Sequence, residues 1–243
     1  MGLQYATQLA EAGCDLLIVS NQEEELPKVA ALLQGQYGVS VVPHYQNLAT
    51  ETASDELLAY CKERGLQVDI LINNAGMFFF EELSRANEGK AMTMMRLHML
   101  APTRNCILFG EEMKGRGYGY IVNMSSMAAK LPAPGITIYS ATKAYLKSFG
   151  KSLYFEMRPY GVGVTTVCPA AIATPLYKLD PKLLKLGVKI GLIGTPQWLV
   201  RRALKGMFRK KRVVKPGLMN RYLPPLIAIL PHGLVDRLWR KFK

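Results

Sequence analysis

The feature that most constrains the fold is a series of short apolar segments separated by stretches long enough to form helices. The segments are rich in β-branched residues and bounded by Gly, Asp, Ser, Asn or Pro, as in strands buried on both faces. The expected strands are 16–19, 39–42, 68–72, 120–124 and 162–167. The expected helices are 23–37, 51–64, 84–114, 140–159 and 196–208. This alternation predicts an α/β fold, in which a doubly wound parallel sheet carries helices on both faces.

The length of 243 residues suits one large domain. We find no repeat or linker, so we expect a single domain over residues 1–243, with a basic C-terminal extension over about 196–243. The four cysteines are scattered, which is typical of a reducing compartment, and we expect a cytoplasmic protein. The apolar stretch 223–230 is too short to cross a bilayer.

Positive charge is concentrated in the last quarter of the chain. Residues 1–177 carry 14 Lys or Arg and 16 Asp or Glu, whereas residues 178–243 carry 17 basic residues and two acidic ones. The asymmetry indicates either an anionic partner or a solvated basic face. Anionic partners include a membrane surface, an acidic carrier protein, a phosphate-bearing substrate and nucleic acid. Nucleic acid is the least expected, because no recognition motif is present.

The final segment has a helical stripe of apolar residues on an otherwise basic background. The stripe consists of Leu234, Val235, Leu238, Trp239 and Phe242. Such a helix either lies at a membrane interface or packs on its own domain or a dimer partner. Peripheral contact with a membrane through this region therefore stays open at this point.

Three side chains have the chemistry of a carbonyl-reducing site. Tyr139 and Lys143 are four residues apart, so they project from one face of a helix. A nearby ammonium favours the phenolate and lowers the pKa of the tyrosine, which makes Tyr139 a candidate general acid or base. Ser126 follows the strand 120–124 and would hydrogen-bond the same carbonyl oxygen. The pair alone is a weak signal, and its position after that strand gives it weight. No metal site is expected.

Three motifs resemble the short-chain dehydrogenase/reductase family. They are Leu-Ile-Asn-Asn-Ala-Gly at 71–76, the strand 120–126 followed by Tyr-Ser-Ala-Thr-Lys at 139–143, and Val-Cys-Pro-Ala-Ala-Ile-Ala-Thr at 167–174. The resemblance covers residues 1 to about 174 and implies a Rossmann-like fold that binds NAD(P)(H). It also implies a homodimer or homotetramer.

The resemblance assigns roles to individual residues. It makes Tyr139 the proton donor, and Lys143 a ligand of the ribose hydroxyls that also lowers the tyrosine pKa. Ser126 orients the substrate carbonyl. The implied cofactor contacts also include residues at strand ends and in the loop after residue 167, namely Gly2, Ser20, Asn21, Asn47, Leu48, Asn74, Ala75, Gly76, Pro169, Ala170, Ile172 and Thr174.

The start of the chain departs from the family pattern. The first strand and most of its glycine-rich turn are absent, and Met1-Gly2 aligns with the last two positions of that turn. The absent strand would lie in the middle of the sheet. We therefore expect the biological protein to begin roughly 10–20 residues earlier, which is enough for one strand and its turn.

Other departures affect the site. His98 stands where the family has a catalytic Asn, and it is either part of a proton relay or a packed helix residue. The strand 16–19 ends in Ser20-Asn21, without the acid that would favour NAD, so we expect NADP(H). Asn47 replaces the usual Asp, and Ala170 replaces the usual Gly.

Two hypotheses from different classes follow. The first is an NAD(P)-dependent oxidoreductase that acts on the carbonyl or secondary alcohol of an apolar substrate. The segment 77–80, Met-Phe-Phe-Phe, would line the substrate cleft or pack against a neighbouring helix. The second is a catalytically silent binding or scaffold protein whose basic C-terminal region contacts membranes or anions. Binding of NADPH separates the two.

Overall fold

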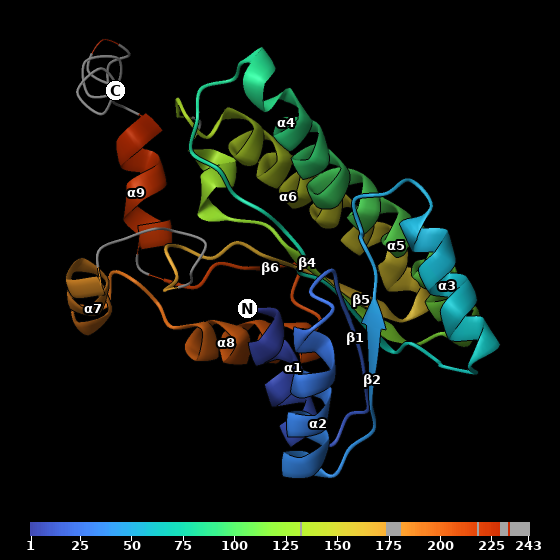
Figure 1. Ribbon diagram of the computed structural model, residues 1–243. Coiled ribbons are helices and arrows are strands. Elements are labelled where there is room, and N and C mark those ends of the chain that lie inside the picture. Colours follow the sequence, from blue (N-terminus) through green and yellow to red (C-terminus); the bar gives the residue numbers. More distant parts are fainter. Residues whose placement is uncertain (132, 174–180, 218, 229–232, 234–243) are drawn as a thin grey trace.

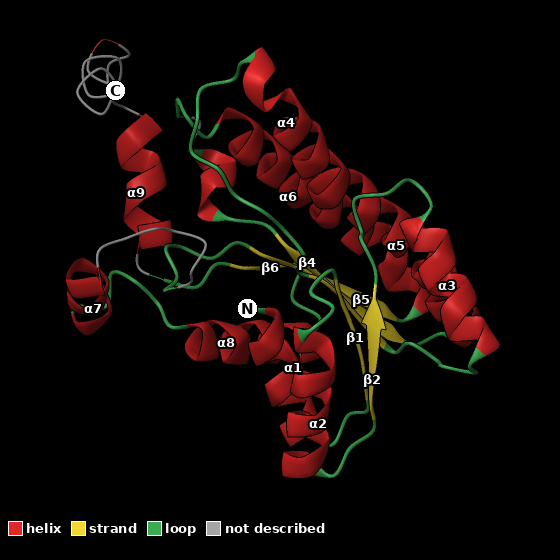
Figure 2. Cartoon of the chain, viewed as in Figure 1, coloured by secondary structure: helices red, strands yellow, loops and turns green. Residues whose placement is uncertain are grey.

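The strands are parallel and form two sheets in a computed structural model that describes residues 1–131, 133–173, 181–217, 219–228 and 233 (Figure 2). The strands are β1 (Leu16–Ser20), β2 (Val41–Tyr45), β3 (Ile70–Asn73), β4 (Gly119–Met124), β5 (Val162–Val167) and β6 (Val213–Val214). One sheet has the order β1-β2 and the other β3-β4-β5-β6. In the described part of the chain no strand pairs with both β1 and β3.

Helices pack on both faces of the strands (Figure 1). On one face α1 and α8 bury Leu9 and Leu199 against Val122 of β4. On the other face α3, α5 and α6 bury residues such as Phe109 against Ile121. Neighbouring residues of a strand point to opposite faces, so β4 contributes to both cores. The predicted α/β Rossmann-like architecture is confirmed.

Four of the five expected helices are present, the fifth is interrupted, and two helices at 181–189 and 219–228 were not expected. The nine helices labelled α in the described residues are α1 (Gly2–Glu11), α2 (Glu25–Tyr37), α3 (Ala53–Glu63), α4 (Glu88–Met95), α5 (Ala101–Arg116), α6 (Thr137–Met157), α7 (Pro181–Lys189), α8 (Pro196–Phe208) and α9 (Met219–Ala228). The single helix expected over 84–114 is divided by a π-helical turn, η2 (Arg96–Leu100). Such turns are frequent at functional sites, and His98 lies in this one.

Local signals explain why α8 begins and β6 follows it. Thr195 caps α8 through its side chain, which accepts a hydrogen bond from the backbone N–H of Trp198, and Pro196 occupies the first turn. The basic run 209–212 follows α8 and leads into β6, where Val213 pairs with Thr166 of β5.

The C-terminal apolar stripe from Leu234 to Phe242 lies outside the described residues. Within the described helices, none combines the length and apolar character needed to span a bilayer.

Gly150 of α6 sets how closely this helix packs on the sheet, since a Cβ there would overlap Thr166 Oγ1 of β5. We expect Gly150→Ala to lower the free energy of unfolding by about 1–3 kcal/mol, although Ala favours helices. The control is Gly35→Ala in α2, where nothing lies within 4 Å. It should raise stability by about 0.5–1 kcal/mol. Urea unfolding measures both, and equal effects would contradict the packing argument.

Candidate active site

Helix α6 brings Tyr139 and Lys143 together beside the carboxyl end of β4. Both side chains are buried, each with 6% of its surface exposed. Lys143 Nζ lies 5.6 Å from the centre of the Tyr139 ring and donates a hydrogen bond of 3.0 Å to the backbone oxygen of Met124. The i to i+4 spacing and the close packing of α6 on β4 and β5 hold both groups in one place.

Ser126 comes from the turn that connects β4 to α6. It is the N-cap of the 3₁₀ turn η3 (Met127–Lys130), where its Oγ accepts a hydrogen bond of 3.1 Å from Ala128 N. Its neighbour Ser125 donates a 2.7 Å hydrogen bond to the backbone oxygen of Lys143. Ser125 thereby ties the strand end to the helix that carries Tyr139, a role that the sequence reasoning missed.

Lys143 is an ammonium group in a low-dielectric setting. Burial lowers its pKa to about 8, and the nearby Cys168 opposes part of that shift. No ion pair within the described residues includes Lys143. An ammonium has three N–H donors and one is used by Met124, so two can bind acceptors of a ligand. This donor set suits the hydroxyl groups of a ribose.

His98 makes two hydrogen bonds inside the protein. Its Nε2 accepts a 3.0 Å hydrogen bond from the backbone N–H of Met77, so Nδ1 carries the proton. Nδ1 lies 3.1 Å from Thr142 Oγ1, which donates to the backbone oxygen of Tyr139. Burial and the charge of Lys143 lower the pKa of His98 to about 2, so the ring is neutral. Of the two roles left open by the sequence, this geometry favours the packed positioning residue.

The end of β3 meets the start of α1, and both fit a dinucleotide. Asn74 Oδ1 is buried without a hydrogen-bond partner in the described structure. A Cβ at Gly2 would come within 3.1 Å of Asn74 Nδ2, and one at Gly76 within 2.9 Å of His98 Nε2. Helix α1 has no side-chain cap at its N-terminus, where free backbone N–H groups favour a phosphate. Ala75, between Asn74 and Gly76, is exposed.

The other predicted cofactor residues of β1 and β2 make local turns. Ser20 Oγ accepts from Gln22 N at 3.2 Å, and Asn47 Oδ1 accepts from Ala49 N at 3.1 Å. Asn21 is exposed and Leu48 half-buried. They follow the carboxyl ends of β1 and β2, the edge at which parallel sheets bind ligands.

The loop after β5 holds the remaining predicted contacts. Pro169 O accepts from Met127 N at 2.8 Å, and Ala170 N donates to Pro216 O at 3.2 Å. Ile172 is buried and forms an isolated bridge with Gly194. Thr174 lies outside the described residues. The described part of the loop is thus fixed against its surroundings.

A buried amide network supports the strand ends, and the sequence reasoning missed most of it. Asn73 Nδ2 donates to Asn123 Oδ1 at 2.9 Å, and Asn105 Nδ2 donates to Asn73 Oδ1 at 3.1 Å. Asn123 was the sequence signal for this network, because a buried amide inside an otherwise apolar strand requires a hydrogen-bond partner.

Comparison with known families decides the affiliation. A sequence profile described as short chain dehydrogenase matches residues 1–182. The chain belongs to the short-chain dehydrogenase family. The human very-long-chain 3-oxoacyl-CoA reductase is 29% identical over 95% of this chain and 72% of its own length. The mouse 17-beta-hydroxysteroid dehydrogenase type 3 is 29% identical over 76% of this chain, but the match spans only 61% of that relative.

Solved structures of two bacterial enzymes share the fold. A short-chain dehydrogenase from Sphingobium yanoikuyae, in complex with NADPH, has 26% identity and a TM-score of 0.78, with 95% of this chain and 92% of that one covered. The bulky-bulky ketone specific alcohol dehydrogenase from Comamonas testosteroni has 26% identity and a TM-score of 0.76, with coverage of 95% and 90%.

A test of the neutral His98 follows from linkage. Its pKa is about 2 in the folded chain and about 6.5 when unfolded, so the stability it contributes is lost as pH falls below 6.5. Between pH 7 and 5 this group should remove about 2 kcal/mol. Urea unfolding of His98→Asn at both pH values should show a smaller loss than the parent. As a control, His44→Asn at a half-buried position should reduce the loss of unfolding free energy between pH 7 and 5 much less. An equal loss in the parent and in His98→Asn would contradict a neutral, buried ring.

Proposed function

We propose that the chain is an NADPH-dependent reductase that interconverts a bulky apolar ketone and its secondary alcohol. The observation that carries the proposal is the buried Lys143 ammonium, 5.6 Å from the centre of the Tyr139 ring. The choice of NADPH is supported by the absence of an acid at Ser20-Asn21 and by the Sphingobium relative bound to NADPH.

The residues of the chain provide acid–base chemistry and orientation. When bound, NADPH supplies the hydride. The Tyr139 hydroxyl donates its proton to the carbonyl oxygen of the substrate, and the Ser126 hydroxyl hydrogen-bonds the same oxygen. Lys143 would hold ribose hydroxyls of the cofactor with its two remaining N–H groups, and it favours the phenolate that is left after proton transfer. In the reverse direction Tyr139 removes the proton of the alcohol.

An apolar substrate is supported by the surroundings of Tyr139 and by the relatives. The Phe78 ring contacts the Tyr139 ring edge-to-face at 5.0 Å, which leaves an apolar wall beside the phenol. The relatives named above act on very-long-chain 3-oxoacyl-CoA, on steroids and on bulky ketones. A large apolar group next to the carbonyl is common to these compounds. The expectations of a homo-oligomer, a cytoplasmic location and membrane contact stay predictions.

Removing the phenol should abolish most of the activity. We expect Tyr139→Phe to lower kcat by roughly 10²–10⁴-fold, because a general acid contributes about that much. The assay follows NADPH absorbance with a panel of bulky aryl ketones, steroid ketones and 3-oxoacyl thioesters. The matched control is Tyr145→Phe on the same helix, whose hydroxyl contacts Thr103 Oγ1 and should leave kcat nearly unchanged. Undiminished turnover in Tyr139→Phe would refute the proposal.

The charge of Lys143 should govern cofactor binding above neutral pH. Its pKa of about 8 means that the ammonium is present below pH 8 and is lost as pH rises through that value. The dissociation constant of NADPH, measured by its fluorescence, should therefore rise across pH 8 in the parent. In Lys143→Met the affinity should be low and nearly independent of pH in this range. The same alkaline rise in both proteins would place the titrating group elsewhere.

A further inference from the structure

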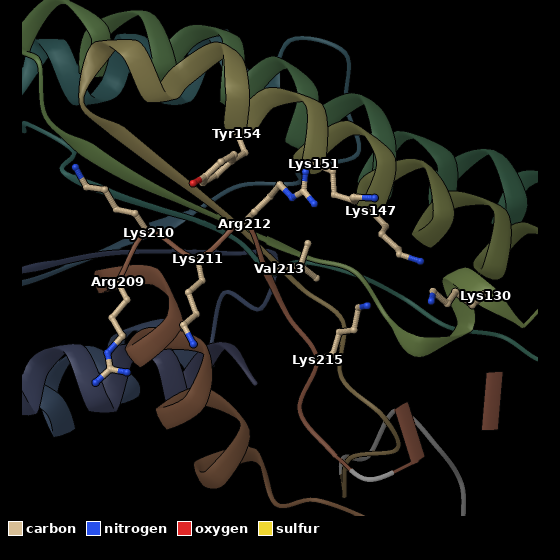
Figure 3. A pocket seen from close by; sticks show the side chains of 10 residues that line it. All are labelled: Lys130, Lys147, Lys151, Tyr154, Arg209, Lys210, Lys211, Arg212, Val213 and Lys215. Atoms are coloured by element: carbon tan, nitrogen blue, oxygen red, sulfur yellow. The ribbon is translucent and has the colours of Figure 1, made fainter. Parts of the chain in front are cut away.

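One hollow of the surface is lined almost wholly by cationic side chains. It lies between α6 and the segment around β6 and has a volume of about 590 Å³ (Figure 3). Eight of its ten lining residues are Lys or Arg, and the other two are Tyr154 and Val213. With no carboxylate in its wall, this hollow differs from an ordinary mixed-charge surface.

Five cations extend toward the space between the two segments, and we call them the inner cations. They are Lys130, Lys147, Lys151, Arg212 and Lys215 (Figure 3). Arg209 and Lys211 also border the hollow, but their charged ends point away from it (Figure 3). The cations that line the hollow are therefore of two kinds, and only the inner cations can contact a single ligand at the same time.

Regular secondary structure holds the inner cations. Lys147 and Lys151 are one turn apart on α6, on the face that also carries Lys143. Arg212 and Lys215 flank β6, which is anchored by the hydrogen bonds from Thr166 N to the backbone oxygen of Arg212 and from Cys168 N to that of Val214. The backbone positions of these cations are therefore set before a ligand binds, and only the side chains have to be ordered.

The turn before β6 is also fixed, at a conformational cost. Lys210 has a φ of 47°. Its backbone N–H donates a hydrogen bond to Met207 O, and the backbone N–H of Lys211 donates one to Gly206 O. This is the helix ending in which Gly is usual, because other residues are strained there. The Lys210 ammonium donates to Gly161 O at 2.7 Å. The sequence thus retains a Lys at a position that favours Gly, and the turn presents Arg212 in a defined place.

The inner cations lack compensating charge. Within the described residues, no ion pair includes any of them. Burial, and then the charge of Lys130, lowers the pKa of Lys147, with Lys215 and Lys151 acting in the same direction. Like charges held together in this way repel one another, and an anion between them would relieve the repulsion.

We propose that this hollow binds a ligand that carries several phosphate groups. Its size is that of a small-molecule site, and Lys and Arg on two facing elements are the donors that phosphates prefer. Lys147 lies eight residues after Tyr139, which is about 12 Å along α6, so the site is separate from the reacting carbonyl. The proposal does not depend on the reductase activity.

The test is calorimetric titration of the full chain with inorganic tripolyphosphate. The variant Lys147→Gln/Lys215→Gln should raise the dissociation constant at least about tenfold, because two convergent charges are lost. The control Lys28→Gln/Lys205→Gln removes two charges from exposed positions of α2 and α8. It should change the dissociation constant less than about twofold. Co-sedimentation with phosphatidylcholine vesicles containing phosphatidylinositol bisphosphate forms a second arm.

The outcomes separate the sources of phosphate. If Lys147→Gln/Lys215→Gln alone binds tripolyphosphate more weakly, the ligand is a free phosphorylated molecule. If it alone binds the vesicles more weakly and its binding of tripolyphosphate is unchanged, the ligand is a lipid headgroup. Equal weakening in both double variants, or no binding of either probe, overturns the proposal. Thermal unfolding shows whether the variants are folded. If Lys147→Gln/Lys215→Gln does not fold, Lys130→Gln/Lys151→Gln, which also removes two inner cations, is tested under the same criteria.

Discussion

The buried contact between α6 and the carboxyl ends of β4 and β5 is the constraint on which the rest of this structure depends. Lys143 can reach Met124 O, and Ser125 can reach the backbone of Lys143, only because α6 lies directly on the sheet. Gly150 permits that approach, since any side chain there would meet Thr166. The same contact places the Tyr139 ring next to the ammonium. The packing of α6 on the sheet therefore also sets the positions of the side chains in the candidate site.

Around this contact the interior is more polar than its position would suggest. His98 is almost fully buried and neutral, and it joins the loop after β3 to the helix that carries Tyr139. The amides of Asn73, Asn105 and Asn123 bond one another between β3, α5 and β4. Buried polar groups destabilise a fold unless they are paired, and networks of this kind also define a single arrangement. Here they join the end of β3 to α5 and β4, and the loop after β3 to α6.

Successive turns of α6 contribute to different parts of the molecule. Its first turns carry the phenol and the ammonium, whereas Lys147 and Lys151 border the basic hollow beside β6. Among the described residues, the positive charge of the C-terminal quarter includes Arg212 and Lys215, which border this hollow. These two converge with cations of α6 and η3, which are distant in the sequence. The division of the strands between β1-β2 and β3-β4-β5-β6 adjoins the start of α1 and the end of β3, close to Gly2 and Asn74.

The sequence by itself determined the class of fold and the approximate positions of the five expected strands, because these follow from local patterns of apolar residues. The roles of Ser126, Tyr139 and Lys143 rest on the resemblance of their motifs to a family and stay predictions. The sequence did not determine the π-helical turn at Arg96–Leu100, which contains His98. It left the role of His98 open, since the state of an imidazole is set by burial and by partners such as Met77 and Thr142 that are far away in the chain. The convergence of Lys130 and Lys147 with Lys215 was likewise decided by the tertiary structure alone. Periodicity shows which face of an element is buried, but only folding brings together groups from different elements.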